Sequence, residues 1–92
     1  MRTIERTSAF KRDYKRLKAT PRHKNIEGLL EETLLSLLLD RSLPARLSDH
    51  ALVGEWKDHR ECHLKPDLLL IYAKPDYETL RLVRLGSHSD LF

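Results

Sequence analysis

The sequence predicts an α+β fold in which two N-terminal helices pack on one face of a largely antiparallel sheet. In the first half of the chain, apolar residues recur at the three- and four-residue spacing of a helix. From Leu47 onward, the apolar runs shorten to strand length and alternate with turn residues. These turns are short, and short turns join antiparallel strands. We therefore expect the order β-α-α, followed by three or four strands.

The length and composition fit one small domain. The chain has 92 residues, with 17 basic and 14 acidic side chains and a net charge of +3, and we expect residues 1–92 to form a single domain. Its single cysteine excludes an internal disulfide and a zinc site built on paired cysteines. The most apolar stretch, residues 29–39, contains charged residues and is too short to cross a membrane. Because no secretory leader is recognisable, we expect a cytoplasmic domain without a membrane partner.

The first half of the chain is predicted to form a strand and two helices. Residues 2–5 are β-prone, and Thr7 or Ser8 can then cap a helix because a short hydroxyl accepts from the free amides of the first turn. Thr20 and Pro21 are typical of the cap and first position of a second helix, which runs toward residue 39. The first helix has the apolar stripe Phe10, Tyr14 and Leu17. The second helix has the apolar face Ile26, Leu29, Leu30, Leu34, Leu37 and Leu38.

Positive charge is concentrated at the N-terminal end. Residues 1–24 contain nine basic and two acidic side chains, a local net charge of +7. Such a concentration is typical of a surface that binds a polyanion, although a solubilising helix face has the same composition. The basic residues opposite the apolar stripe of the first helix are Lys11, Arg12, Lys15, Arg16 and Lys18.

The second half is predicted to form strands at residues 47–53, 55–64, 68–73 and 79–85. In the second of these, Arg60, Cys62 and Leu64 should face one way, because side chains alternate along a strand. His59, Glu61 and His63 should face the other way. Residues 68–73 are apolar on both faces, as in a central strand covered on both sides.

Four of the five histidines lie in this second half: His50, His59, His63 and His88. Histidine can both take and give a proton near neutral pH, so a cluster of histidines with Glu61 and Asp67 would suit acid–base chemistry. Single surface histidines usually have no such role. His59, Cys62 and His63 are residue types that bind metal, but they do not suit a shared site, because Cys62 faces away from both histidines on a strand. Cys62 is better explained as a small buried residue, and Trp56 is either a core anchor or a surface aromatic.

The motifs of the second half resemble the YafQ branch of the RelE-type toxins. They are DHALVGEWK at residues 49–57, RECH at 60–63, PD at 66–67, LIY at 70–72, GSH at 86–88 and the closing LF at 91–92. The short strand and basic helix at the start also fit, so the resemblance covers nearly the whole chain. Glu61 stands where close relatives carry Asp, and Leu68 stands where an aromatic residue is expected from the resemblance.

The resemblance implies a RelE-like fold and a ribosome-dependent mRNA endonuclease, the toxin of a type II toxin–antitoxin pair. It implies cleavage in the ribosomal A site without metal or cofactor, by attack of a 2′-hydroxyl on the adjacent phosphorus. The family's site corresponds to His50, His63, Asp67, His88 and Phe92. His88 would then be the general acid, Asp67 or His63 the base, and Phe92 a stacking surface. Glu61 and Arg84 are supporting candidates, although Arg84 could equally form a structural ion pair.

The same resemblance implies two kinds of partner. The basic helix would contact ribosomal RNA while the histidines face the mRNA. A cognate DinJ-like antitoxin of the ribbon-helix-helix class would restrain the toxin. Two other classes of function remain open at this stage: a non-catalytic relative that retains antitoxin or RNA binding, and a metal-dependent hydrolase that uses three of the histidines.

Overall fold

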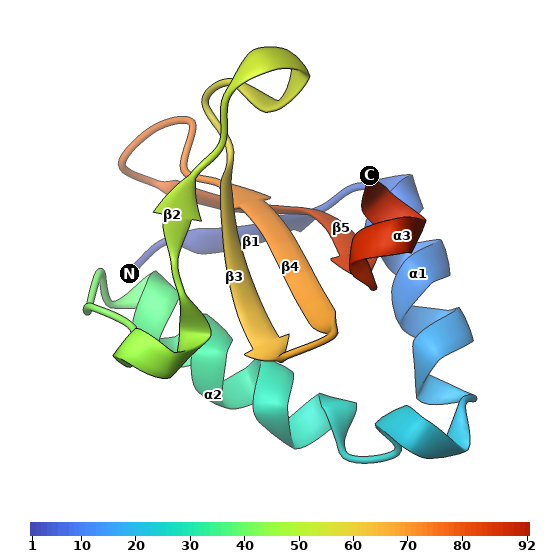
Figure 1. Ribbon diagram of the computed structural model, residues 1–92. Helices are drawn as coiled ribbons and strands as arrows, with labels where there is room; N and C mark the ends of the chain where they lie inside the picture. The colour runs from blue at the N-terminus through green and yellow to red at the C-terminus, as the bar shows by residue number, and fades with distance from the viewer.

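The computed structural model describes residues 1–92 and contains one five-stranded sheet with strand order β1-β5-β4-β3-β2 (Figure 1). The helices are α1 (Ser8–Lys18), α2 (Ile26–Leu38) and the short α3 (His88–Leu91). The strands are β1 (Thr3–Arg6), β2 (His50–Ala51), β3 (Arg60–Lys65), β4 (Leu68–Ala73) and β5 (Thr79–Gly86). Three short 3-10 turns complete the chain: η1 (Pro21–His23), η2 (Ala45–Leu47) and η3 (Gly54–Trp56). The predicted α+β fold is confirmed.

The sheet is antiparallel from β2 to β5, as the short turns predict. β1 is the exception, because it lies at the edge and pairs in parallel with β5. A parallel partner must be reached by a long crossover. Here the crossover consists of both N-terminal helices and the three strands that follow them.

The first helix begins as predicted, and the second does not. Thr7 caps α1 by accepting the amide of Phe10 at 3.0 Å. Thr20 and Pro21 start only the 3-10 turn η1, and α2 begins at Ile26. The chain changes direction in η1, so that α2 can cross the sheet rather than continue from α1 (Figure 1).

Two predictions for the second half are wrong. The strand expected at residues 47–53 is reduced to the two residues of β2, because η2 ends at Leu47 and the backbone at Ser48 adopts the left-handed conformation. The strand expected at residues 55–64 begins only at Arg60, because η3 occupies Gly54–Trp56. After Gly86, the chain forms the helix α3. There the Ser87 hydroxyl accepts from the amide of Asp90, and the Asp90 carboxylate accepts from the amide of Ser87. Such a reciprocal cap satisfies two free amides of a first turn.

The main core lies between the sheet and the two N-terminal helices. It joins Phe10, Leu17, Ile26, Leu30 and Leu37 to buried residues of β3, β4 and β5. Every residue of β4 is buried, which confirms the prediction of a central strand. A much smaller cluster of Leu69, Ile71 and Leu91 lies on the opposite face, beneath α3. No helix is long and apolar enough to span a bilayer.

Candidate active site

Strand β3 presents the candidate residues on the face of the sheet opposite α1 and α2. Cys62 and Leu64 belong to the main core, as the alternation predicts. Glu61 and His63 therefore point to the other side. We call this side, with His50, Glu61, His63, His88 and Phe92, the histidine face.

His50 and Glu61 form a close pair at the edge of the histidine face. They are opposite one another in the β2–β3 register, and Nε2 of His50 lies 3.0 Å from Oε2 of Glu61. The preceding Asp49 accepts from the hydroxyl of Tyr72 at 2.6 Å and from Arg60 at 3.3 Å. These bonds anchor the backbone that carries His50.

Both ring nitrogens of His50 face an oxygen atom. Its Nδ1 lies 2.6 Å from the carbonyl oxygen of Ser48, while its Nε2 faces Glu61. A neutral imidazole has one N–H and can donate to only one of these oxygens. Both ring nitrogens of His50 are therefore directed at fixed oxygen atoms, which hold the orientation of the ring. Glu61 is 5% exposed and its Oε1 has no hydrogen-bond partner. The carboxylate of Glu61 therefore interacts with His50 rather than with solvent.

His63 lies beside this pair, and its ring centroid is 6.4 Å from that of His50. Unlike Glu61, His63 is only half-buried. Its side chain can therefore meet a substrate on the histidine face. The sequence predicted both its direction and its proximity to Glu61.

His88 and Phe92 form the other end of the histidine face. Phe92 directly follows α3, and its ring centroid lies 5.0 Å from that of His88 and 6.2 Å from that of Trp56, which it meets edge-on. Trp56 packs against Leu69, Ile71 and Leu91, so it is a half-buried aromatic residue at the candidate site and not an anchor of the main core. Phe92 keeps 53% of its surface exposed, which leaves a ring face for stacking.

The two ends of the histidine face are separated by one strand. His63 is opposite Leu69, and Leu69 is opposite Gly86, two residues before His88. Neighbouring strands lie about 4.8 Å apart, so β3 and β5 are roughly 10 Å apart here. His63 and the start of α3 are therefore about two strand spacings apart at this end of the sheet.

Asp67 is less closely associated with the other candidates. It lies in the turn between β3 and β4, and its carboxylate accepts from Arg22 of η1 at 3.3 Å. Its side chain is 64% exposed, and it makes no hydrogen bond to any of the histidines. The structure brings together His50, Glu61 and His63, and separately His88 and Phe92, whereas Asp67 is at the end of the sheet.

Arg84 forms a structural ion pair, which is one of the two roles that the sequence analysis considered for it. Its Nε donates to Asp13 at 2.7 Å and its Nη2 donates at 3.2 Å. Burial would raise the pKa of Asp13, but the hydrogen bonds from Arg84 and from the amide of Leu85 outweigh burial and hold the pKa below its ordinary value. The sequence analysis did not identify Asp13 as the partner of Arg84. The signal was present, because it is the only acidic residue in α1.

The five basic residues predicted to bind RNA divide into two groups. Lys11, Arg12 and Lys15 are exposed and form no ion pair. Arg16 instead lies 3.6 Å from Asp13 and 3.8 Å from Asp90, and Lys18 lies 3.7 Å from Glu27.

Neither a reactive thiol nor a cluster of metal ligands is found at the site. Burial raises the pKa of the Cys62 thiol to about 12, helped by the charges of Asp49 and Glu61. The interpretation of Cys62 as a buried residue is therefore confirmed. No three side chains of the types His, Cys, Asp or Glu lie close enough together to hold a metal ion.

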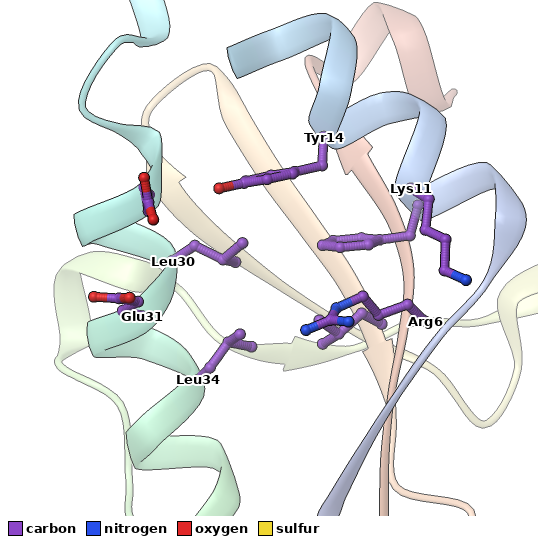
Figure 2. A pocket seen from close by; sticks show the side chains of 9 residues that line it. Arg6, Lys11, Tyr14, Leu30, Glu31 and Leu34 are labelled. Atoms are coloured by element: carbon purple, nitrogen blue, oxygen red, sulfur yellow. The ribbon is translucent and has the colours of Figure 1, made fainter.

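A groove of about 430 Å³ lies elsewhere, between α1 and α2 (Figure 2). Its walls differ in charge, because α1 and the preceding strand contribute Lys11 and Arg6, whereas α2 contributes Glu27 and Glu31. Tyr14, Leu30 and Leu34 line its interior. None of the histidines lies in this groove, so its chemistry is separate from that of the histidine face.

Comparison with known proteins gives consistent results. Residues 2–92 match the family model described as a bacterial toxin of type II toxin–antitoxin system, YafQ. The chain is 40% identical over 93 residues to the mRNA interferase toxin YafQ of Escherichia coli, covering 99% of this chain and 96% of that protein.

Solved structures of similar proteins share the fold. The E. coli DinJ–YafQ complex contains a chain with 36% identity and a TM-score of 0.85, covering 100% of this chain and 99% of that one. A copper-bound mutant toxin from Helicobacter pylori has 38% identity and a TM-score of 0.87, with both chains fully covered.

Proposed function

This chain belongs to the YafQ family of bacterial type II toxins, and from that premise we infer that it is an mRNA interferase whose cleavage site is the histidine face. The observation that carries this proposal is the position of three imidazoles, from three separate parts of the sequence, on one face of the sheet. The alternative of a non-catalytic relative is disfavoured because this chain retains all four candidate acid–base residues.

Cleavage by internal attack requires three things from the protein. The 2′-oxygen forms a bond to the adjacent phosphorus while the bond to the 5′-oxygen of the next nucleotide breaks. A base must take the proton of the 2′-hydroxyl, and an acid must give a proton to the departing 5′-oxygen. Positive charge must stabilise the negative charge that develops on the phosphate.

We assign these roles from the geometry. His63 is half-buried on the histidine face and is the base, whereas Asp67 is paired with Arg22 at the end of the sheet. His88 approaches from the other side of the roughly 10 Å interval and is the acid. His50, held in place by Glu61 and lying beside His63, orients and stabilises the phosphate. Phe92 stacks on a base, a contact typically worth about 1–3 kcal/mol.

The setting of the reaction follows from charge and family. We propose that the mRNA is cut on the ribosome in the cytoplasm, with Lys11, Arg12 and Lys15 against ribosomal RNA. These three exposed side chains are free of ion pairs and can neutralise phosphates. The partner that restrains the toxin is a cognate antitoxin related to DinJ, which accompanies YafQ in the E. coli complex.

The test is inducible expression of wild-type protein beside His88→Ala, with mapping of mRNA ends on ribosomes. We expect ends within coding regions for the wild type and a loss of about 100- to 10,000-fold for the variant. Tyr77→Ala is the control, because this side chain is 93% exposed in the turn at the opposite end of the sheet. Equal cleavage by wild type and His88→Ala would refute the assignment. Cleavage of ribosome-free RNA by the purified protein that is abolished by EDTA would favour the metal-dependent hydrolase.

A further inference from the structure

The short helix α3 carries His88, yet it has little stability of its own. It has four residues, and isolated helices shorter than about 12 residues are marginal in water. Its cap satisfies its first amides, and Leu91 contributes to a cluster of only three buried residues. The position of His88 must therefore be maintained by contacts outside α3.

Asp13 of α1 holds the end of the strand that leads into α3. β1 stops opposite Leu82, while β5 continues to Gly86. In place of the missing strand, the Asp13 carboxylate accepts the amide of Leu85 at 3.0 Å and the guanidinium of Arg84. Asp13 is only 6% exposed, so its carboxylate is largely shielded from water, although the side chain of Arg84 is 30% exposed. Buried charges of this kind are costly unless they are fully paired.

Arg16 extends this contact from α1 to α3 itself. One guanidinium nitrogen lies 3.6 Å from Asp13, and the other lies 3.8 Å from Asp90. Asp90 takes part in the reciprocal cap of α3, in which its carboxylate accepts the amide of Ser87. It also packs closely on the strand, because a Cβ atom at Gly86 would lie 3.1 Å from Asp90. α1 and α3 accordingly lie side by side at one end of the sheet (Figure 1).

We propose that Asp13 and Arg16 are positioning residues that hold α3 on the sheet and thereby fix His88 opposite His63. This inference rests on the proposed function, since it assigns His88 a proton to deliver. Arg16 then has a structural task on the toxin itself and is not one of the side chains that contact ribosomal RNA. A displacement of about 1 Å in a catalytic group can reduce the rate about 100-fold.

The experiment measures kcat and KM for cleavage of a defined mRNA on purified, programmed ribosomes. We expect Arg16→Gln and Asp13→Asn to lower kcat about 10- to 100-fold and to leave KM within about twofold. Arg16→Lys, which retains the charge, should recover most of the rate. Glu5→Gln is the matched control, because it removes an ion pair to Arg81 near the start of β5.

The single tryptophan gives a readout that does not depend on activity. Trp56 contacts Phe92, so release of α3 should shift its emission and increase its quenching by acrylamide. Arg16 is 51% exposed, and its variants should fold even if Asp13→Asn does not.

Three results would overturn the inference. The first is an unchanged kcat in Arg16→Gln, and the second is an increased KM with kcat unchanged, which would return Arg16 to the RNA-binding surface. The third is acrylamide quenching of Trp56 in Arg16→Gln that is identical to quenching in the wild type. Failure of the wild-type protein to cleave would instead refute the proposed function, and Trp56 would still report whether α3 is held.

Discussion

The two faces of the sheet differ in residue composition and in how much apolar surface they bury. The face beneath α1 and α2 contributes to a core of 14 buried residues, all of them apolar apart from the hydroxyl of Tyr72 and the thiol of Cys62. The histidine face has a cluster of only three buried apolar residues. Beside this cluster it carries Glu61 and His63.

This difference teaches how so small a chain can be both stable and reactive. A domain of this size buries only about 60–65% of its unfolded surface, so it can build one substantial core. When that core lies entirely on one face, the polar residues of the other face are not needed for stability. Substitutions on the two faces should therefore have opposite consequences.

The largest effect is expected on the histidine face. His63→Ala should reduce mRNA cleavage about 100- to 10,000-fold, equivalent to about 3–5 kcal/mol in the barrier. Its unfolding free energy should change by less than about 1 kcal/mol, because the side chain is only half-buried and outside both apolar clusters. Cleavage assays on programmed ribosomes and urea unfolding measure the two quantities. A large loss of stability with normal cleavage would invalidate the contrast.

The reverse result is expected from Leu70→Ala in β4. Leu70 is completely buried in the main core, and truncation should reduce the unfolding free energy by about 2–5 kcal/mol. Cleavage per folded molecule should be unchanged at low temperature. Leu35→Ala is the control, because this leucine is 51% exposed in α2 and should change stability by less than about 0.5 kcal/mol.

A smaller effect is expected from reversing the charge of Lys11, Arg12 and Lys15 to Glu. If these side chains neutralise phosphates, the slope of log affinity for ribosomes against log salt should decrease by about 2–3. The unfolding free energy should be nearly unchanged, because all three are exposed. Reversal of the exposed Arg41 and Arg46 tests whether net charge alone is responsible. An equal change in slope for both sets would exclude a specific surface on α1.

The smallest effect concerns His23 in η1. Burial, together with the charges of Lys65 and Arg22, holds the pKa of His23 below its ordinary value. As pH falls below about 6.5, the unfolded chain takes up a proton that the folded protein does not. Stability should therefore decrease from pH 7.5 to 5.5 more in the wild type than in His23→Gln, as measured by urea unfolding. Equal decreases would show that His23 is not responsible.

Much of the fold was predictable because it follows from local patterns. Helical spacing identified α1, alternation identified which residues of β3 face the core, and a continuous apolar run identified β4 as central. The start of α2 and the extent of β2 were not predictable. They depend on where η1 and η2 turn the chain so that α2 can lie across the sheet.

The candidate site was predictable in part. The family resemblance indicated His50, His63, His88 and Phe92, and alternation placed Glu61 and His63 on one face. The ion pair of Arg84 with Asp13, 71 residues apart in the chain, could not be inferred from spacing.

The sequence by itself determined the class of fold, the burial of β4 and the residue types available for proton transfer. These depend on periodicity and composition, which act over a few neighbouring residues. Only the tertiary structure decided that β1 would end before Leu85, so that the amide of Leu85 donates to Asp13. It further decided that Glu61 would lie against His50. It also decided that α3 would fold back beside α1. The physical reason is that hydrogen bonds and ion pairs between distant segments exist only after the sheet has brought those segments together.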